Sequence, residues 1–224
     1  QPSIFTEYCQ NGSLINMIEK ERKSKCKIQE LNLTQKLIVI YGIAKAMSFL
    51  HSKNIIHRDL KPENVLLNDF LFPKITDFGL AIQIPPQEEE IQMQDTSGTI
   101  RYIAPEILKY NKYSKASDVY AFAFLLYRFL FLKDPYEDYS NQHIIYKVAF
   151  NNERPGLKKI SKIYKINEAF CLLIKSCWSD NPKERPTFDK IVEKLANDPK
   201  LFANDVDAAL FKKYVSSFQD KSNT

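Results

Sequence analysis

Glycine is scarce in this chain: the 224 residues contain only 5, and none are spaced as Gly-x-Gly-x-x-Gly. Loops that cradle nucleotide phosphates need such glycines, because the backbone must approach the phosphate closely. The printed residues therefore hold no glycine-rich phosphate loop. Cysteine is also scarce, and Cys9, Cys26, Cys171 and Cys177 form no Cys-x-x-Cys pair. So few cysteines in so long a chain predict reduced thiols and a cytoplasmic protein.

Charge of one sign is not concentrated in one region. The formal net charge is +5, and the basic cluster between Lys20 and Lys27 is typical of a solvated helix end, so we expect no nucleic-acid partner. No signal peptide is visible, and the apolar residues 118–132 are too few for a membrane span and include Arg128. The first residue is Gln1, so we expect a processed start or a fragment.

Three short motifs follow one another along the chain. They are His57-Arg58-Asp59-Leu60-Lys61-Pro62-Glu63-Asn64, then Asp77-Phe78-Gly79, then Ala104-Pro105-Glu106. Each motif alone arises by chance or marks only a turn. In this order and at these spacings they closely resemble the catalytic loop, the metal-binding loop and the end of the activation segment of eukaryotic protein kinases. The fold of that family places a small β-rich N-lobe over a helical C-lobe, with ATP between them.

The resemblance implies a chemical role for each motif residue. Asp59 would accept the proton of the substrate hydroxyl and orient its oxygen for in-line attack. Lys61 would approach the transferred phosphate. Asn64 and Asp77 would bind Mg²⁺, a hard cation that prefers oxygen ligands, together with the phosphates of ATP and water. The implied reaction transfers the γ-phosphoryl group of ATP to a hydroxyl of a protein substrate.

The beginning of the chain resembles the kinase hinge. Residues 4–8 predict a short strand that ends in Glu-Tyr. By the resemblance, Thr6 would be the gatekeeper, and the carbonyl of Glu7 and the backbone of Cys9 would face the adenine. Leu66 would lie under the adenine ring. An edge strand without any nucleotide contact is the alternative interpretation of the same residues.

Helical spacing of apolar residues predicts a mainly α fold. Thr34 can cap a helix that runs to about Ser52, and a helix from Asp118 to about Leu132 is apolar on nearly every face, which is typical of burial. In kinases, the aspartate that opens this helix hydrogen-bonds the catalytic-loop backbone. Further helices are expected over residues 13–21, 141–150, 168–177 and 188–196, and short strands over residues 65–67 and 74–76.

Residues 77–106 form a long polar segment with few periodic signals, which we expect to be extended. Thr96 and Ser97 lie near its end. A phosphate on either hydroxyl could pair with Arg58 and order the segment, or the hydroxyls could merely cap turns, and the residues favour neither. Thr99 follows a glycine, as in serine/threonine kinases, where this threonine touches the catalytic loop.

Two features indicate the kinase group. Residues 178–188 closely match the C-lobe ending of tyrosine-kinase-like and tyrosine kinases, where Arg185 would form a buried ion pair with Glu106. Tyrosine kinases typically have Ala or Arg where this chain has Lys61 and Pro62. The chain thus resembles a serine/threonine kinase of the tyrosine-kinase-like group.

The resemblance covers residues 1–196 as the hinge and C-lobe of a kinase domain, and it leaves residues 197–224 as a helical tail. The printed sequence contains no Val-Ala-Ile-Lys strand, so we expect a kinase C-lobe without its N-lobe. One interpretation is a serine/threonine kinase whose N-lobe was lost from this sequence or truncated. The other is a catalytically silent C-lobe that acts as a scaffold. The intact catalytic and metal-binding residues favour the first, and the missing N-lobe favours the second.

Overall fold

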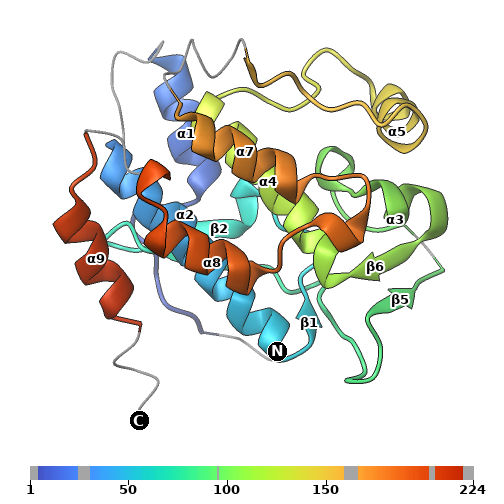
Figure 1. Ribbon diagram of the computed structural model, residues 1–224, viewed down its shortest axis with the longest axis horizontal. Helices are drawn as coiled ribbons and strands as arrows, with labels where there is room; N and C mark the ends of the chain where they lie inside the picture. The colour runs from blue at the N-terminus through green and yellow to red at the C-terminus, as the bar shows by residue number, and fades with distance from the viewer. Residues whose placement is uncertain (1–4, 25–30, 95, 159–165, 202–204, 219–224) are drawn as a thin grey trace.

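The computed structural model describes residues 5–24, 31–94, 96–158, 166–201 and 205–218, and this part of the chain is mainly helical, as predicted (Figure 1). The α-helices are α1 (Leu14–Lys23), α2 (Leu33–Ser52), α3 (Pro105–Tyr110), α4 (Lys115–Phe131), α5 (Asn141–Ala149), α7 (Glu168–Cys177), α8 (Phe188–Asn197) and α9 (Ala208–Ser216). The strands are β1 (Ile55–Ile56), β2 (Val65–Leu67), β3 (Pro73–Ile75), β4 (Ile82–Gln83), β5 (Glu90–Gln92) and β6 (Lys112–Ser114). Ile4 and Cys26, which enter the sequence predictions, lie outside the described residues.

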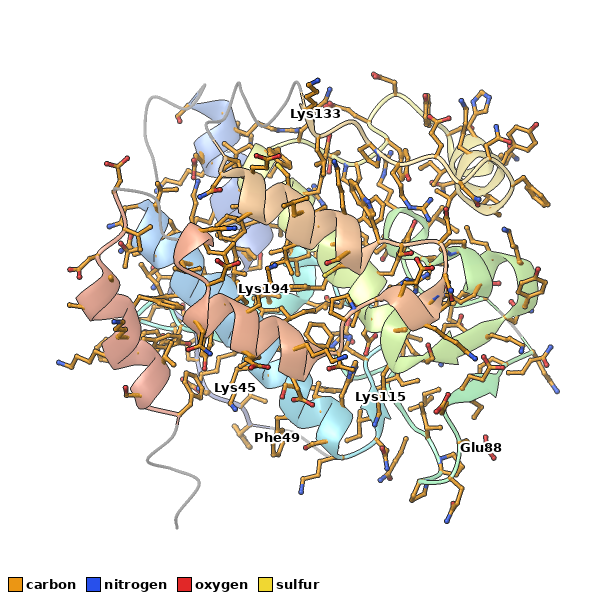
Figure 2. All side chains as sticks on the ribbon, viewed as in Figure 1. Lys45, Phe49, Glu88, Lys115, Lys133 and Lys194 are labelled. Atoms are coloured by element: carbon orange, nitrogen blue, oxygen red, sulfur yellow. The ribbon has the colours of Figure 1, made fainter. Side chains whose placement is uncertain are left out.

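The core lies among α2, α4, α7 and α8, where α2 packs along α8 and α4 along α7 (Figure 1). Side chains fill the space between these helices (Figure 2). Every residue of α4 from Ser117 to Phe131 is buried except Arg128, which confirms the predicted central helix. The helix begins before the predicted Asp118, with Ser114 as its N-cap, and the backbone N–H of Ser114 donates to the Ser117 hydroxyl at 3.1 Å. Asp118 therefore lies in the first turn, close to the catalytic loop.

Helix α2 begins with Asn32 as its N-cap, so the predicted cap at Thr34 is wrong. Asn32 Oδ1 accepts from the N–H of Gln35 at 2.9 Å, and the Gln35 side chain accepts from the N–H of Asn32 at 2.9 Å. This capping box gives hydrogen-bond acceptors to two backbone N–H groups that the start of a helix leaves unpaired. Thr34 Oγ1 instead accepts from the N–H of Asp207, just before α9, at 2.8 Å.

By length and composition alone, α2 is apolar enough to cross a membrane, but 61% of its apolar window is buried inside the protein. Helix α8 packs on it, and α9 covers another part of it. Tyr41 of α2 contacts Phe211 and Tyr214 of α9 edge-on, at ring-centroid distances of 5.6 and 6.0 Å. Thus α2 is a core helix and does not indicate a membrane span.

Three antiparallel strand pairs surround the motifs: β1 with β4, β2 with β3, and β5 with β6. The β2–β3 hairpin brings Asn64, before β2, close to Asp77, after β3. The other two pairs hold residues 77–106 against the remainder of the protein. The segment that was predicted to be simply extended therefore contains β4, β5 and a 3₁₀ helix over Ile100–Tyr102.

The hinge strand predicted over residues 4–8 is not present in its described part, residues 5–8. Phe5 is 96% exposed and Tyr8 is 83% exposed. A strand forms when a neighbour satisfies its backbone groups, and no strand of the described chain pairs with this segment. A backbone hydrogen bond to the β2–β3 hairpin forms only further along the chain, where the N–H of Asn11 donates to the Leu67 carbonyl at 3.3 Å.

Candidate active site

Asp59 lies at the centre of a hydrogen-bonded cluster built from the catalytic loop and the activation segment. Its Oδ1 accepts from the backbone N–H of Thr99 at 3.2 Å and from the Thr99 hydroxyl at 2.9 Å. Its Oδ2 accepts from Lys61 Nζ at 2.5 Å and from Asn64 Nδ2 at 3.1 Å. Lys61 Nζ also donates to the Thr99 hydroxyl at 2.9 Å. The prediction that Thr99 touches the catalytic loop is confirmed.

Asp118, which is 1% exposed, anchors the backbone of the catalytic loop from α4. Its two oxygens accept from the backbone N–H of His57 at 2.9 Å and of Arg58 at 3.0 Å. The same carboxylate is 2.9 Å from His51 Nε2. Arg58 has a φ of +69°, a conformation that is costly for a residue with a side chain. The Asp118 bonds hold the loop in this conformation, as the resemblance predicted.

His57 is fully buried, and its two ring nitrogens connect the catalytic and metal-binding loops. The N–H of Asp59 donates to His57 Nδ1 at 3.3 Å, so Nδ1 must carry a lone pair. The proton therefore resides on Nε2, which lies 3.1 Å from the Thr76 carbonyl and donates to it. The ring also contacts Phe78, at a centroid distance of 5.3 Å. Residues on both sides of Asp77 are thus held against the catalytic loop.

Asn64 and Asp77 present oxygen atoms that fit a hard cation. The Asn64 amide nitrogen donates to the Asp59 carbonyl and carboxylate, at 2.9 and 3.1 Å, which leaves Oδ1 as a neutral ligand. The backbone N–H of Thr76 bonds to the Asn64 carbonyl at 3.0 Å and ties the two loops together. Asp77 is exposed, and the N–H of Gly79 reaches its Oδ1 only weakly, at 3.4 Å. In the described chain no three His, Cys, Asp or Glu side chains form a metal cluster, so Mg²⁺ would need phosphate oxygens and water as further ligands.

Of the residues expected at the adenine, Glu7 and Leu66 lie at the β2–β3 hairpin. Thr6 is exposed, and the Glu7 carboxylate pairs with Lys74 of β3 at 2.8 Å. The Cys9 carbonyl accepts from the N–H of Gly12 at 3.1 Å, within a turn. Leu66 is half-buried and pairs with the residue just before α1. The contacts of these four residues with a nucleotide remain a prediction.

Two residues near α3 were missed by sequence reasoning, although both hold the activation segment. Asn111, with a φ of +51°, accepts from the Thr96 hydroxyl at 2.6 Å. The Tyr113 hydroxyl bonds to the backbone of Ser97, and the Arg58 guanidinium lies over the Tyr113 ring. A role for Thr96 or Ser97 as a phosphate acceptor remains a prediction.

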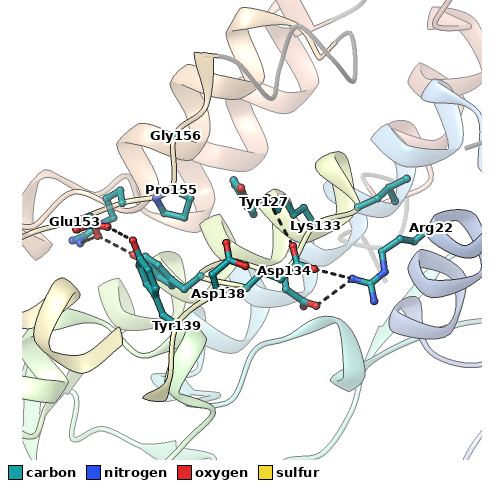
Figure 3. Close-up of a pocket in the computed structure, with 13 residues that line it drawn as sticks. Arg22, Tyr127, Lys133, Asp134, Asp138, Tyr139, Glu153, Pro155 and Gly156 are labelled. Carbon is teal, nitrogen blue, oxygen red and sulfur yellow. Dashed lines mark hydrogen bonds and ion pairs between the residues drawn. The ribbon is translucent and has the colours of Figure 1, made fainter. Parts of the chain in front are cut away.

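A cavity of about 760 Å³ lies beside the end of α4, with Arg22 of α1 on one side and residues 153–156 on the other (Figure 3). A second cavity of about 320 Å³ is lined by Glu63 and Thr99. Both cavities include Asp134 and Glu137 in their walls. An open surface rich in charged side chains therefore leads away from Thr99.

Comparison with known proteins gives the family of this chain. The model of the protein tyrosine and serine/threonine kinase family matches residues 1–195, so the chain belongs to this family. It is 34% identical to a probable serine/threonine-protein kinase, gdt2, of Dictyostelium discoideum over 86% of this chain and 11% of that kinase.

Two other relatives illustrate the range of kinases that the chain resembles. It is 35% identical to the serine/threonine/tyrosine-protein kinase HT1 of Arabidopsis thaliana, over 86% of this chain and 46% of that kinase. It is 33% identical to the cytoplasmic tyrosine-protein kinase BMX of Mus musculus, over 86% of this chain and 28% of that kinase. The chain spans less than half the length of each of these three relatives.

Proposed function

We propose that this chain is the catalytic C-lobe of a protein serine/threonine kinase that uses Mg-ATP. The observation that carries the proposal is the cluster in which Asp59 accepts hydrogen bonds from both Lys61 and Thr99. A scaffold has no need of a carboxylate held in this way at the edge of an open surface. Family membership and the intact metal-binding residues support the same reaction.

In the proposed reaction, the oxygen of the substrate hydroxyl bonds to the γ-phosphorus of ATP. Asp59 accepts the proton that this hydroxyl loses. The bond between that phosphorus and the oxygen bridging to the β-phosphate breaks, and ADP leaves. Thr99 and Lys61 fix the rotation of the Asp59 carboxylate, so that it faces one direction before the substrate arrives. The Lys61 ammonium lies beside the same carboxylate and can neutralise charge on the transferred group.

The nucleotide would lie on the face formed by the hinge and the β2–β3 hairpin. Thr6, Glu7, Cys9 and Leu66 would contact the adenine, and Asn64 and Asp77 would hold Mg²⁺. The metal supplies charge neutralisation on the phosphates when it is bound. The exposed Asp77 carboxylate and the Asn64 amide oxygen are suited to this, because both are hard ligands.

Serine and threonine are the acceptors that the site favours. Lys61 and Thr99 lie beside Asp59 and enclose it from two sides, which suits a short acceptor side chain. The named relatives include a tyrosine kinase and a kinase of both specificities, so acceptor choice needs its own measurement. Reduced thiols and the buried α2 fit a cytoplasmic enzyme that acts on protein substrates.

The test is transfer of labelled γ-phosphate by the full-length kinase to a peptide library that contains Ser, Thr and Tyr acceptors. We expect phosphoserine and phosphothreonine to account for most of the product. Mainly phosphotyrosine would overturn the acceptor, and no transfer to any peptide or to the kinase itself would favour a catalytically silent scaffold.

A further inference from the structure

The proposed reaction leaves one buried residue between the two halves of the site without a role. Tyr113, the middle residue of β6, is 0% exposed. Its hydroxyl accepts from the N–H of Ser97 at 2.7 Å and donates to the Ser97 carbonyl at 3.1 Å. A tyrosine hydroxyl has one proton to donate, so Tyr113 gives it to the same residue from which it accepts. The activation segment is thus clamped through its backbone, whatever side chain stands at position 97.

The ring of the same tyrosine faces the catalytic loop. The central carbon of the Arg58 guanidinium lies 4.3 Å from the Tyr113 ring centroid, well within cation–π range. Arg58 is itself fixed, because its N–H bonds to Asp118 and its side chain donates to the Leu80 carbonyl at 3.2 Å. Tyr113 therefore touches the catalytic loop with its ring and the activation segment with its hydroxyl.

The residue between Ser97 and Thr99 shows how closely these two segments approach. Gly98 has a φ of +115°, and a Cβ on it would lie 2.9 Å from the Arg58 carbonyl oxygen. A side chain at this position would therefore be strained and would meet backbone. Thr99 follows directly and gives both its N–H and its hydroxyl to Asp59. Ser97 and Thr99 are thus each held by hydrogen bonds, one on either side of this close approach.

We propose that Tyr113 is a positioning residue for phosphoryl transfer, which holds Ser97 so that Thr99 orients the Asp59 carboxylate. This inference rests on the proposed function. Strand pairing supports it, since Tyr113 lies opposite Ile91 in the β5–β6 pair and its backbone is fixed within that pair. Tyr113 acts through Thr99 and does not itself contact the reacting groups.

The first test is Tyr113→Phe in the full-length kinase, which removes the hydroxyl and keeps the ring over Arg58. We expect kcat to fall about tenfold, the order of effect that loss of two hydrogen bonds produces. KM for ATP should stay within about twofold, because Tyr113 touches none of the residues assigned to the nucleotide. Tyr146→Phe, at an exposed tyrosine of α5, is the matched control and should leave kcat unchanged.

A double variant distinguishes action through Thr99 from a separate effect. If Tyr113 works by placing Thr99, Thr99→Ala combined with Tyr113→Phe should be no slower than Thr99→Ala alone. If the fall in kcat of the double variant equalled the product of the two single falls, the proposal would be overturned. A Tyr113→Phe variant with the kcat of the wild-type kinase would also overturn it.

Amide hydrogen exchange tests the clamp without relying on catalysis. In Tyr113→Phe, the amides of Ser97 and Thr99 should exchange about tenfold faster, while the amides within α4 keep their rates. Faster exchange throughout α4, together with a lower melting temperature, would show a merely structural role and overturn the proposal. If the wild-type kinase transfers no phosphate, the proposed function fails, but faster exchange confined to residues 96–99 would still support the clamp.

Discussion

Arg185 and Glu106 form a bidentate ion pair across the C-lobe. The two terminal guanidinium nitrogens, Nη1 and Nη2, lie 2.6 and 2.8 Å from the two carboxylate oxygens. The Arg185 side chain is 0% exposed. Its remaining donors bond to the Ala116 carbonyl at 3.0 Å and the Ser179 carbonyl at 2.8 Å. The pair joins the end of the activation segment to the start of α4 and to the residues after α7, as the resemblance predicted.

Glu106→Gln should lower the free energy of unfolding by about 3–5 kcal/mol, because the buried guanidinium would lose its charge partner. Urea denaturation followed by circular dichroism measures this. The matched control is Lys133→Gln, which breaks an exposed pair with Glu137 at 3.8 Å. We expect that substitution to cost less than about 1 kcal/mol. Equal effects of the two substitutions would contradict the structural role given to Glu106.

Asp77→Asn should weaken binding of Mg-ATP by the full-length kinase, since the substitution removes the anionic ligand proposed for the metal. The loss should be about tenfold or more in Kd and should disappear when nucleotide binding is measured without Mg²⁺. Calorimetric titration measures both. Asp69→Asn, at an exposed aspartate in the β2–β3 loop, is the control. Unchanged Mg²⁺ dependence in Asp77→Asn would remove Asp77 from the metal site.

Residues 1–224 as an isolated polypeptide should bind Mg-ATP weakly or undetectably and should transfer no phosphate. The printed sequence offers the adenine one apolar wall and offers the phosphates no glycine-rich loop, so little of the nucleotide would be buried. The apolar surface near Phe5, Leu66 and Ile75 should also promote self-association. Calorimetry and sedimentation of the purified polypeptide measure these properties. Micromolar Mg-ATP binding to a monomer would show that these residues need no further phosphate contacts.

Cys177 should resist alkylation in the folded protein. Complete burial at the end of α7 raises the pKa of its thiol to about 12, so almost no thiolate exists at pH 8. Cys9 is partly exposed and should react before Cys177. Iodoacetamide labelling at pH 8 with mass spectrometry of the peptides gives the order. Because the folded-state pKa is raised, protection of Cys177 should hold across pH 7–9 and vanish in urea. Rapid labelling of Cys177 without urea would contradict the packing of α7.

The sequence predicted the helices well, because their apolar faces repeat at helical spacing and pack on one core. The central position of α4 follows from apolar residues on all its faces. The N-cap of α2 was assigned wrongly, because threonine and asparagine are both residue types that commonly cap helices, and Thr34 and Asn32 lie two positions apart. Only Gln35, three residues after Asn32, favours the correct one. The hinge strand failed for a different reason: strand formation depends on a partner, which local sequence does not specify.

The residues proposed for catalysis and metal binding could be selected from the sequence, because they lie within short motifs of fixed spacing, and their roles stay predictions. The contacts of Thr99 and Asp118 with the catalytic loop also followed from the family resemblance. Tyr113 was not predictable, because it lies outside those motifs and looks like an ordinary buried aromatic in a strand. Its role depends on which backbone it meets in three dimensions, and the β5–β6 pairing that places it joins residues about twenty positions apart.

The most direct test of this account is the turnover of Asp59→Asn in the full-length kinase. Asn cannot accept the hydroxyl proton as a carboxylate does, so kcat should fall by about 10²–10⁴-fold. The Kd for Mg-ATP should change by less than about twofold, because Asp59 acts on the acceptor side. Asp69→Asn serves again as the control and should keep full activity. Wild-type turnover in Asp59→Asn would contradict the assignment of Asp59 as the catalytic base.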